Sequence, residues 1–461
     1  MRGKRFSIGL RAALAVFAVT LLVTSTWAAT NWHEKVLFNF NGTDGYQPMY
    51  GLIFDAAGNL YGTAFGGGDP SCGDPNGCGT VFQLTPAPGG GWTETVLHSF
   101  KGYPTDGSYP YAGVIFDAAG NLYGTTDWGG TYGGGTVFEL TPTAGGGWTE
   151  KVLHSFGNGA DAAFPYACLI FDAAGNLYGT TGGGGTYGVG TVFELSPAAG
   201  GGWTETVLHS FNGSDGHGPE AGLIFDAAGK LYGTTAWGGT GTDCLNTGCG
   251  TVFKLTPVAG GGWTETVLHS FSNTDGALPF AGLIFDAAGN LYGTTQQGGS
   301  YGFGTVFELT PTAGGGWTET VLFSFNGNWS GRDGGLPEAG LIFDAAGNLY
   351  GTTGAGGTYA YGTAFELTPT AGGGWTETVL HSFNNNGTDG ESPLAGLIFD
   401  AAGNLYGTTG GGGTYGLGMV FELTPIYPCV PKCSHTVSSG GVDVLPSGWR
   451  DVLEHGGIER P

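Results

Sequence analysis

The decapeptide Phe54-Asp55-Ala56-Ala57-Gly58-Asn59-Leu60-Tyr61-Gly62-Thr63 decides the fold, because the chain repeats it seven times with almost no change. Its aspartate recurs every 54 to 62 residues, at Asp55, Asp117, Asp172, Asp226, Asp286, Asp344 and Asp400. A fixed period of this length is typical of solenoids and propellers, in which each repeat buries its core only against its neighbours. The chain is therefore one unit of about 56 residues, written seven times.

Composition supports a folded repeat. Glycine and proline supply 97 and 22 of the 461 residues, a share that without a period would indicate a disordered chain. Aromatic residues, however, make up 13% of the chain and recur at fixed places in the unit. We interpret the glycines as turn residues of an all-β repeat.

The first thirty residues differ from the repeats. Four basic residues precede an apolar run over 12–23, and small residues follow it. This order predicts a secretory signal peptide over 1–29, with cleavage near Ala28 or Ala29. A membrane anchor is the alternative, but the run is short for a span of ~20 residues. We expect a secreted or cell-surface protein with no transmembrane span in the mature chain.

The chain is also strongly acidic. Its formal net charge is −24, and removal of the leader, which carries four basic and no acidic residues, makes it −28. Such a surface repels phosphate, so we do not expect nucleic acid as a partner.

Seven cysteines suit an exported chain. Six of them form short-spaced pairs, and we expect a local disulfide in each rather than metal binding or redox chemistry. The pairs are Cys72 with Cys78, Cys244 with Cys249, and Cys429 with Cys433. Cys168 stands alone and is expected to be a buried free thiol.

The copy at 202–257 shows how one unit is built. Four short segments rich in β-branched or aromatic residues, at 203–211, 221–226, 231–235 and 250–256, are separated by glycine-containing loops. Each segment predicts a strand. Between the second and third segments, the Asp-Ala-Ala-Gly-Asn turn predicts a tight hairpin with glycine in the left-handed region and aspartate accepting amide hydrogen bonds. A calcium site is the alternative, but calcium takes six or more oxygens and each turn offers one carboxylate.

Seven four-stranded units predict an all-β fold, a seven-bladed β-propeller with four antiparallel strands per blade over 30–426. Residues 427–461 form a non-repeat C-terminal tail. An open solenoid would show the same period, but the two ends favour a ring. Segment 32–40 is a copy of the fourth strand, and the last unit, which stops after Thr424, lacks that strand. We expect strand 32–40 to pair into the last blade and close the ring.

By analogy with other propellers, the Gly-Leu-Ile-Phe segment would be the innermost strand and the Trp-Thr-Glu-Thr-Val-Leu-His-Ser-Phe segment the outermost. The outermost strand would alternate Trp, Glu, Val, His and Phe on one side with Thr, Thr, Leu and Ser on the other.

These repeats, Gly-Leu-Ile-Phe-Asp-Ala-Ala-Gly-Asn-Leu-Tyr-Gly-Thr-Thr followed by Gly-Gly-Thr-Tyr-Gly-x-Gly-Thr-Val-Phe-Glu-Leu, resemble the GloVer tandem-repeat family of exported bacterial proteins over about 32–426. They resemble more loosely the NHL-type propeller repeat. The resemblance implies a secreted or surface-attached propeller and provides no catalytic residue set. Members are expected to end in a surface anchor, but 427–461 show no apolar helix followed by basic residues.

The copies differ from one another mainly in two loops, the one that enters each inner strand and the one between the second and third strands. Both loops would emerge on one face, which is our candidate for binding. Aspartates recur in the first of these loops and would ring the channel mouth. They are interpreted as loop caps followed by a glycine at positive φ, with a cation or sugar-hydroxyl site as the alternative. They are Asp44, Asp106, Asp161, Asp215, Asp275, Asp333 and Asp389.

Aromatic residues recur in the second loop and could stack on sugar rings, although such rings also pack between loops. These ligand-binding candidates are Trp128, Trp237, Tyr132, Tyr187, Tyr301, Tyr359 and Tyr415. Histidines recur in the outermost strand, at His98, His154, His209, His269 and His381. Phe38 and Phe323 occupy the same position, so we interpret the histidines as packing residues and predict no metal site and no cofactor.

Catalysis needs different groups converging on one reacting atom, whereas seven near-copies repeat the same groups. We therefore expect an exported noncatalytic propeller, a monomer, that binds polysaccharide or an envelope protein through its variable face. A purely structural surface-layer or matrix protein is the alternative, and a glycan-active hydrolase or lyase comes third.

Overall fold

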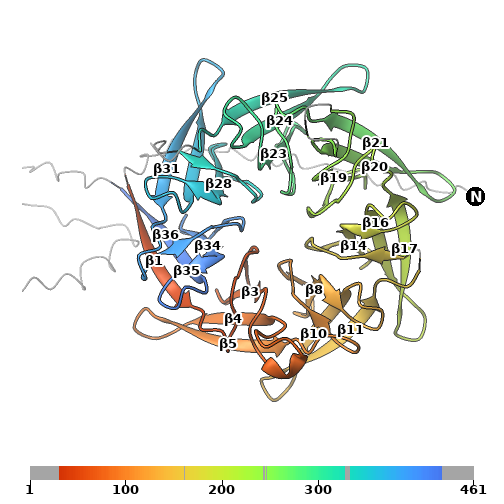
Figure 1. The fold of residues 1–461 in the computed structure, drawn as a ribbon, viewed down its shortest axis with the longest axis vertical. Helices are drawn as coiled ribbons and strands as arrows, with labels where there is room; N and C mark the ends of the chain where they lie inside the picture. Colours follow the sequence, from red (N-terminus) through yellow and green to blue (C-terminus); the bar gives the residue numbers. More distant parts are fainter. Residues whose placement is uncertain (1–30, 160, 242–243, 245–246, 328–332, 428–461) are drawn as a thin grey trace, which may run out of the picture. The chain divides into compact units, whose positions relative to one another are not determined.

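The computed structural model describes residues 31–427, apart from 160, 242–243, 245–246 and 328–332. The predicted signal peptide, the Cys429 and Cys433 pair and the tail beyond Tyr427 lie outside the described residues. Residues 31–426 form one compact unit of seven four-stranded antiparallel sheets, arranged in a ring about a central axis (Figure 1). The predicted seven-bladed β-propeller is confirmed.

Each blade runs from an inner strand through a second and a third strand to an outer strand. The inner strands are β2 (Ile53–Phe54), β7 (Ile115–Phe116), β13 (Ile170–Phe171), β18 (Ile224–Phe225), β22 (Ile284–Phe285), β27 (Ile342–Phe343) and β33 (Ile398–Phe399). The second strands are β3 (Leu60–Ala64), β8 (Leu122–Thr126), β14 (Leu177–Thr181), β19 (Leu231–Thr235), β23 (Leu291–Thr295), β28 (Leu349–Thr353) and β34 (Leu405–Thr409). The third strands are β4 (Thr80–Pro86), β10 (Thr136–Pro142), β16 (Thr191–Pro197), β20 (Thr251–Pro257), β24 (Thr305–Pro311), β30 (Thr363–Pro369) and β36 (Met419–Ile426). The outer strands are β5 (Trp92–Ser99), β11 (Trp148–Ser155), β17 (Trp203–Ser210), β21 (Trp263–Ser270), β25 (Trp317–Ser324), β31 (Trp375–Ser382) and β1 (Asn31–Asn39).

The first strand closes the ring. β1 pairs antiparallel with β36 along its whole length, from Asn31 opposite Ile426 to Asn39 opposite Met419. In Figure 1 the red β1 lies beside the blue β36 as the outer strand of the seventh blade. This confirms the predicted closure, and it gives β36 a partner on the edge that would otherwise be open.

The core lies between the blades. The phenylalanine that follows each outer strand packs edge to face on the third-strand phenylalanine of the next blade, with ring centroids 5.0–5.1 Å apart at all seven junctions. Phe40 and Phe82 form the junction between the seventh and first blades, and both are fully buried. Each apolar cluster accordingly combines residues of two neighbouring blades.

The glycine of the Leu-Tyr-Gly-Thr strand makes room for this core. At Gly124, a Cβ atom would lie 2.6 Å from Cζ of Phe138 and 3.2 Å from Cγ1 of Val114. Any side chain there would displace the ring on which the neighbouring blade packs. The repeat therefore needs glycine inside a strand, where glycine is otherwise unfavourable.

The outer strands depart from the predicted alternation. In β5, the burial of side chains alternates from Trp92 to Val96, but Leu97 is then buried although the pattern places it outward. The cause is a β-bulge, since Val81 pairs with His98 while Phe82 pairs with Val96. All seven outer strands show the same register shift.

The repeated Asp-Ala-Ala-Gly-Asn hairpin forms as predicted. The Asp55 carboxylate accepts hydrogen bonds from the backbone amides of Ala57 and Asn59, both at 2.9 Å, and Gly58 has φ +85°. The Asp55 carboxylate also accepts from Tyr61 at 3.1 Å, so it ties the turn to the second strand. The structural interpretation of this repeated aspartate therefore accounts for its contacts.

Candidate functional site

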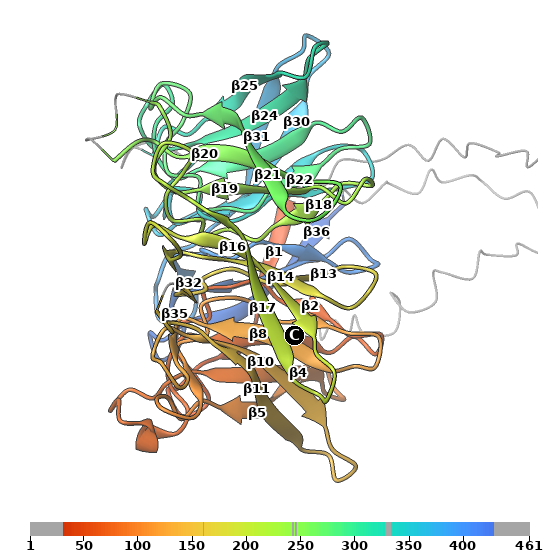
Figure 2. The ribbon, with the colours of Figure 1, turned by 90° about the vertical axis from the view of Figure 1, so that its right-hand side faces the viewer.

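The two variable loops of each blade lie on one face and are tied to each other. In four blades they pair as short strands: β6 (Gly107–Ser108) with β9 (Trp128–Gly129), β12 (Ala162–Ala163) with β15 (Gly183–Gly184), β26 (Gly334–Gly335) with β29 (Ala355–Gly356), and β32 (Gly390–Glu391) with β35 (Gly411–Gly412). In the other three blades, single bridges join the same loops. Figure 2 shows β32 and β35 on the left-hand face of the ring. This face also carries the short 3-10 helix η1 (Pro70–Cys72).

One groove on this face has an aromatic lining. It has a volume of about 630 Å³. It lies between the two loops that lead into the inner strands of the second and third blades and the loop that joins the second and third strands of the second blade. Its walls include Tyr103, Trp128 and Tyr132, whose side chains are 66%, 50% and 53% exposed. Glycines form much of the remaining lining, together with Ser108 and Asp161. We call this hollow the aromatic groove.

The rings of the groove are held in place by their neighbours. Trp128 lies against Phe164, with ring centroids 5.2 Å apart. Tyr109 stacks on Phe65 at 5.0 Å, and its hydroxyl donates to the Asp74 carboxylate at 2.5 Å. Burial, the hydrogen bond and the charge of that carboxylate raise the pKa of Tyr109 to about 12. A preorganised aromatic surface loses little conformational freedom when a ligand binds.

The backbone that presents these side chains is fixed as well. Tyr109 and Phe164, which each precede a proline, have φ of 59° and 63°. The amide of Phe164 donates to the carbonyl of Gly134, and the carbonyl of Phe164 accepts from Gly182, both at 2.8 Å. The residue before the corresponding proline has positive φ in every blade, while its side chain differs between blades. Because this conformation recurs in all seven blades, it is part of the loop structure of the repeat.

The other aromatic candidates are placed differently. Trp237 occupies the position of Trp128 in the fourth blade, but it is partly buried between His217 and Phe280, at 5.5 and 5.6 Å. The repeated tyrosines are all more than half exposed, at Tyr132, Tyr187, Tyr301, Tyr359 and Tyr415. Of these tyrosines, only Tyr132 lines the aromatic groove.

The repeated loop aspartates do not ring the channel mouth, where we expected them. They lie between the outer strands of neighbouring blades, because the loop turns back on the outer strand directly after leaving it. Asp106, for example, accepts from the amide of Lys101 at 2.9 Å and lies 3.1 Å from His98. The glycine that follows takes positive φ after Asp44, Asp215 and Asp275. Capping of the loop is therefore one role of these residues.

The repeated histidines combine packing with a polar contact. Each ring lies edge to face on the core phenylalanine two residues later, with centroids 4.6–4.8 Å apart. Each Nε2 atom also lies 3.1–3.4 Å from the carboxylate of the following loop aspartate. The packing was predicted from the sequence, whereas the contact with the aspartate was not.

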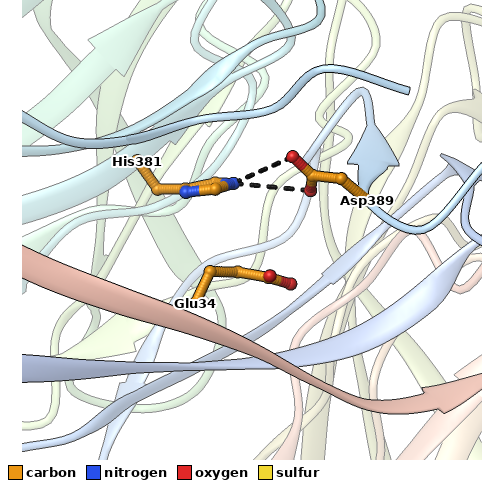
Figure 3. A group of neighbouring side chains, drawn as sticks. All are labelled: Glu34, His381 and Asp389. Atoms are coloured by element: carbon orange, nitrogen blue, oxygen red, sulfur yellow. Dashed lines mark hydrogen bonds and ion pairs between the residues drawn. The ribbon is translucent and has the colours of Figure 1, made fainter. Parts of the chain in front are cut away.

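A glutamate from the next outer strand completes each of these sites. In five places one ligand atom each of histidine, aspartate and glutamate lies within 4.8 Å of the others, and we call these places the outer-strand triads. They are Glu34, His381 and Asp389; His98, Asp106 and Glu150; His154, Asp161 and Glu205; His209, Asp215 and Glu265; and His269, Asp275 and Glu319. Figure 3 shows the first of them, in which the carboxylate of Glu34 lies beside the His381 and Asp389 pair.

A second polar group lies at the central axis and was also missed. Its members are Tyr50, Tyr111, Tyr166, Asp127, Glu220 and Glu338, which we call the axial cluster. The three tyrosines come from successive blades and contact each other at 5.1 and 5.2 Å. Asp127 is only 5% exposed. For four members the sequence signal was the variable residue x of the Pro-x-Ala segment before the inner strand, at Tyr111, Tyr166, Glu220 and Glu338.

The carboxylates of the axial cluster have raised pKa values. Burial, aided by mutual repulsion, raises the pKa of Glu220 to about 7, and burial raises the pKa of Asp127 to about 7. Burial also raises the pKa of Glu338, which accepts a 2.6 Å hydrogen bond from Gln296. Glu220 and Glu338 occupy the same repeat position in the fourth and sixth blades, whereas Asp127 has no acidic counterpart in the other blades.

Two of the predicted disulfides are present. Cys72 is bonded to Cys78, and Cys244 to Cys249. The first closes the enlarged loop that carries Asp74, the partner of Tyr109, and so supports the aromatic groove. Cys168 is the one unpaired cysteine among the described residues.

Comparison with known proteins identifies the repeat. The model of the Gloeobacter/Verrucomicrobia repeat family matches residues 71–245 and 241–438. No curated protein matches the chain. Among solved structures, a "putative 6-phosphogluconolactonase" from Bacteroides uniformis ATCC 8492 is similar at 15% identity, with a TM-score of 0.45, over 72% of this chain and 84% of that one. The activity in that description belongs to that protein.

The part of the chain that the structure describes contains no helix of the length and apolar character that a membrane crossing requires.

Proposed function

The chain belongs to the Gloeobacter/Verrucomicrobia repeat family, and on that premise we propose that it is an exported, noncatalytic propeller that binds polysaccharide through the aromatic groove. The observation that carries this proposal is the set of exposed rings of Tyr103, Trp128 and Tyr132 around one hollow of about 630 Å³. Sugar rings present C–H faces that stack on aromatic side chains, while their hydroxyls need nearby polar groups.

The polar groups of the groove suit such a ligand. Ser108 and Asp161 line the hollow beside the aromatic rings, so polar groups of the protein lie within reach of a bound sugar. The net charge of −24 favours a neutral or cationic glycan over a polyanionic one.

Export remains part of the proposal and rests on residues 1–29, whose order of basic, apolar and small residues is that of a signal peptide. N-terminal sequencing of the protein recovered from the outside of an expressing cell tests this step. A mature N-terminus at residue 29 or 30 is expected, and an intact Met1 in the cytoplasmic fraction would contradict it.

The binding proposal is tested by screening the chain that begins at residue 30 against a glycan array and a panel of insoluble polysaccharides. Retention by at least one neutral or cationic glycan is expected. Binding to an envelope protein in a pull-down without any glycan binding would replace polysaccharide by protein as the ligand. The absence of both would favour a purely structural surface-layer or matrix role.

A hydrolase or lyase is the second candidate, and the observation that favours it is the axial cluster, where Asp127 and Glu220 have pKa values of about 7. Groups that titrate near neutral pH suit general acid and base catalysis. Release of soluble sugar from the same panel, abolished in Glu220→Gln, is the result that would support this candidate over a noncatalytic role.

A further inference from the structure

The outer-strand triads bring together the three side chains that most often bind transition metals with nitrogen and oxygen ligands. Each triad takes its histidine from one outer strand, its aspartate from the loop that follows, and its glutamate from the outer strand of the next blade. The same combination recurs at five of the seven blade junctions. At the other two, phenylalanine replaces histidine, at Phe38 beside Asp44 and Glu94 and at Phe323 beside Asp333 and Glu377.

The spacing of the ligand atoms is close to that of a tetrahedral zinc site. Zinc bonds of ~2.0–2.1 Å to nitrogen and oxygen place neighbouring ligand atoms ~3.3–3.4 Å apart. The Nε2 to Oδ2 distance is 3.1–3.4 Å in the five triads. The glutamate oxygen, within 4.8 Å of both, needs only a small side-chain movement to join them.

The glutamates also lack a partner for their buried charge. At all seven junctions, including the two without histidine, the Oε1 atom of the glutamate is inaccessible to solvent and accepts no hydrogen bond; the residues are Glu34, Glu94, Glu150, Glu205, Glu265, Glu319 and Glu377. A buried acceptor that faces a second carboxylate is costly unless a proton or a cation lies between the two.

The ligand set selects the class of metal. Calcium and magnesium prefer sites made of oxygen alone, whereas an imidazole with two carboxylates suits zinc and its neighbours in the first transition row. The histidine side chains are 16–21% exposed, so an ion can enter from solvent.

We propose that each of the five outer-strand triads binds one divalent transition-metal ion, with Zn²⁺ as the natural occupant, through His Nε2 and one oxygen each of Asp and Glu. A water molecule completes the tetrahedron. The metal joins the outer strands of neighbouring blades at their periphery, and it therefore reinforces the ring.

The chain supplies its own matched variants for a test. His98→Phe installs the residue that Phe323 already places at the equivalent position, so the variant is expected to fold. Phe38→His completes a sixth triad with Asp44 and Glu94, which are both in place. The untagged chain from residue 30 is freed of metal with a chelator and titrated with Zn²⁺ by isothermal titration calorimetry. The zinc that stays bound is then measured by inductively coupled plasma mass spectrometry. Binding of Co²⁺, followed by its visible absorption, reports tetrahedral geometry.

Five equivalents of Zn²⁺ are expected for the wild type, four for His98→Phe and six for Phe38→His, with a rise in melting temperature as the sites fill. Circular dichroism of the metal-free proteins verifies that both variants fold. The proposal would be overturned if the folded wild type bound no zinc. It would also be overturned if the number of zinc ions bound per chain were the same in both variants as in the wild type. Since none of these measurements involves a glycan, they stand independently of the proposed binding function.

Discussion

Thr408 and Tyr50 are 358 residues apart in the chain, yet the Thr408 hydroxyl donates a 3.3 Å hydrogen bond to the Tyr50 carbonyl. The equivalent threonine of each other blade donates to a carbonyl of the next blade, at 2.9–3.2 Å. The bond from Thr408 is thus the seventh member of a ring of interblade contacts. It joins the seventh blade, of which β1 is the outer strand, to the first.

Deletion of residues 31–39 is therefore expected to open the ring. β36 would lose its partner along eight residues and present an unpaired edge to other molecules. We expect aggregation or domain-swapped oligomers and a lower melting temperature, measured by light scattering after size exclusion and by circular dichroism. A chain that begins at residue 31 is the control. An unchanged mass and melting curve after the deletion would show that closure contributes nothing.

Substitution of Gly124 by alanine should destabilise the protein through the interblade core. The added Cβ atom would lie 2.6 Å from Phe138, and such overpacking costs ~1–3 kcal/mol of unfolding free energy. Gly145→Ala is the matched control, because a Cβ atom there meets nothing within 4 Å. Urea unfolding of both variants measures the difference. Equal stability of the two would mean that the close approach of Phe138 is not required.

Stability should depend on pH through the buried outer-strand glutamates. Burial, with a smaller contribution from nearby aspartates, raises the pKa of Glu94 and Glu377 from 4.5 to about 7. Between these values the folded state holds protons that the unfolded chain has lost, so stability falls as the pH rises from about 4.5 to 7 and levels off above it.

The double variant Glu94→Gln and Glu377→Gln isolates this effect at the two junctions without histidine. Its melting temperature, measured without metal, should fall less steeply than that of the wild type between about pH 5 and pH 7.5. Parallel curves for the two proteins would contradict the assignment of the shift to these carboxylates.

The architecture could be predicted from the sequence because the same four-strand unit occurs seven times. The copy of the outer strand at 32–40 identified the closure, and the spacing of Cys72 and Cys78 identified a disulfide. The bulge at Leu97 was not visible, because a strand pattern gives no register against its partner. The approach of His98, Asp106 and Glu150 was missed for a related reason, since the glutamate comes from the following repeat and only the packing of two blades brings it near.

The sequence predicted the face and the residue types of the candidate binding site, but not the blade that carries it. The loops that vary between the copies pointed to one face, and Trp128 and Tyr132 were named on it. Nothing in the sequence separated Trp128 from Trp237, which occupies the same repeat position. The difference arises from neighbours, since Phe280 and His217 cover Trp237 whereas Trp128 remains half exposed beside a groove.

That difference provides the most direct test of the central claim, that function resides in the aromatic groove. The affinity of the mature protein for the glycan found in the screen is compared among wild type, Trp128→Ala and Trp237→Ala by calorimetric titration, with melting curves to verify folding. We expect Trp128→Ala to weaken binding at least about tenfold, as the loss of ~1.4 kcal/mol of stacking requires, and Trp237→Ala to bind as the wild type does. Full affinity in a folded Trp128→Ala protein would contradict the account.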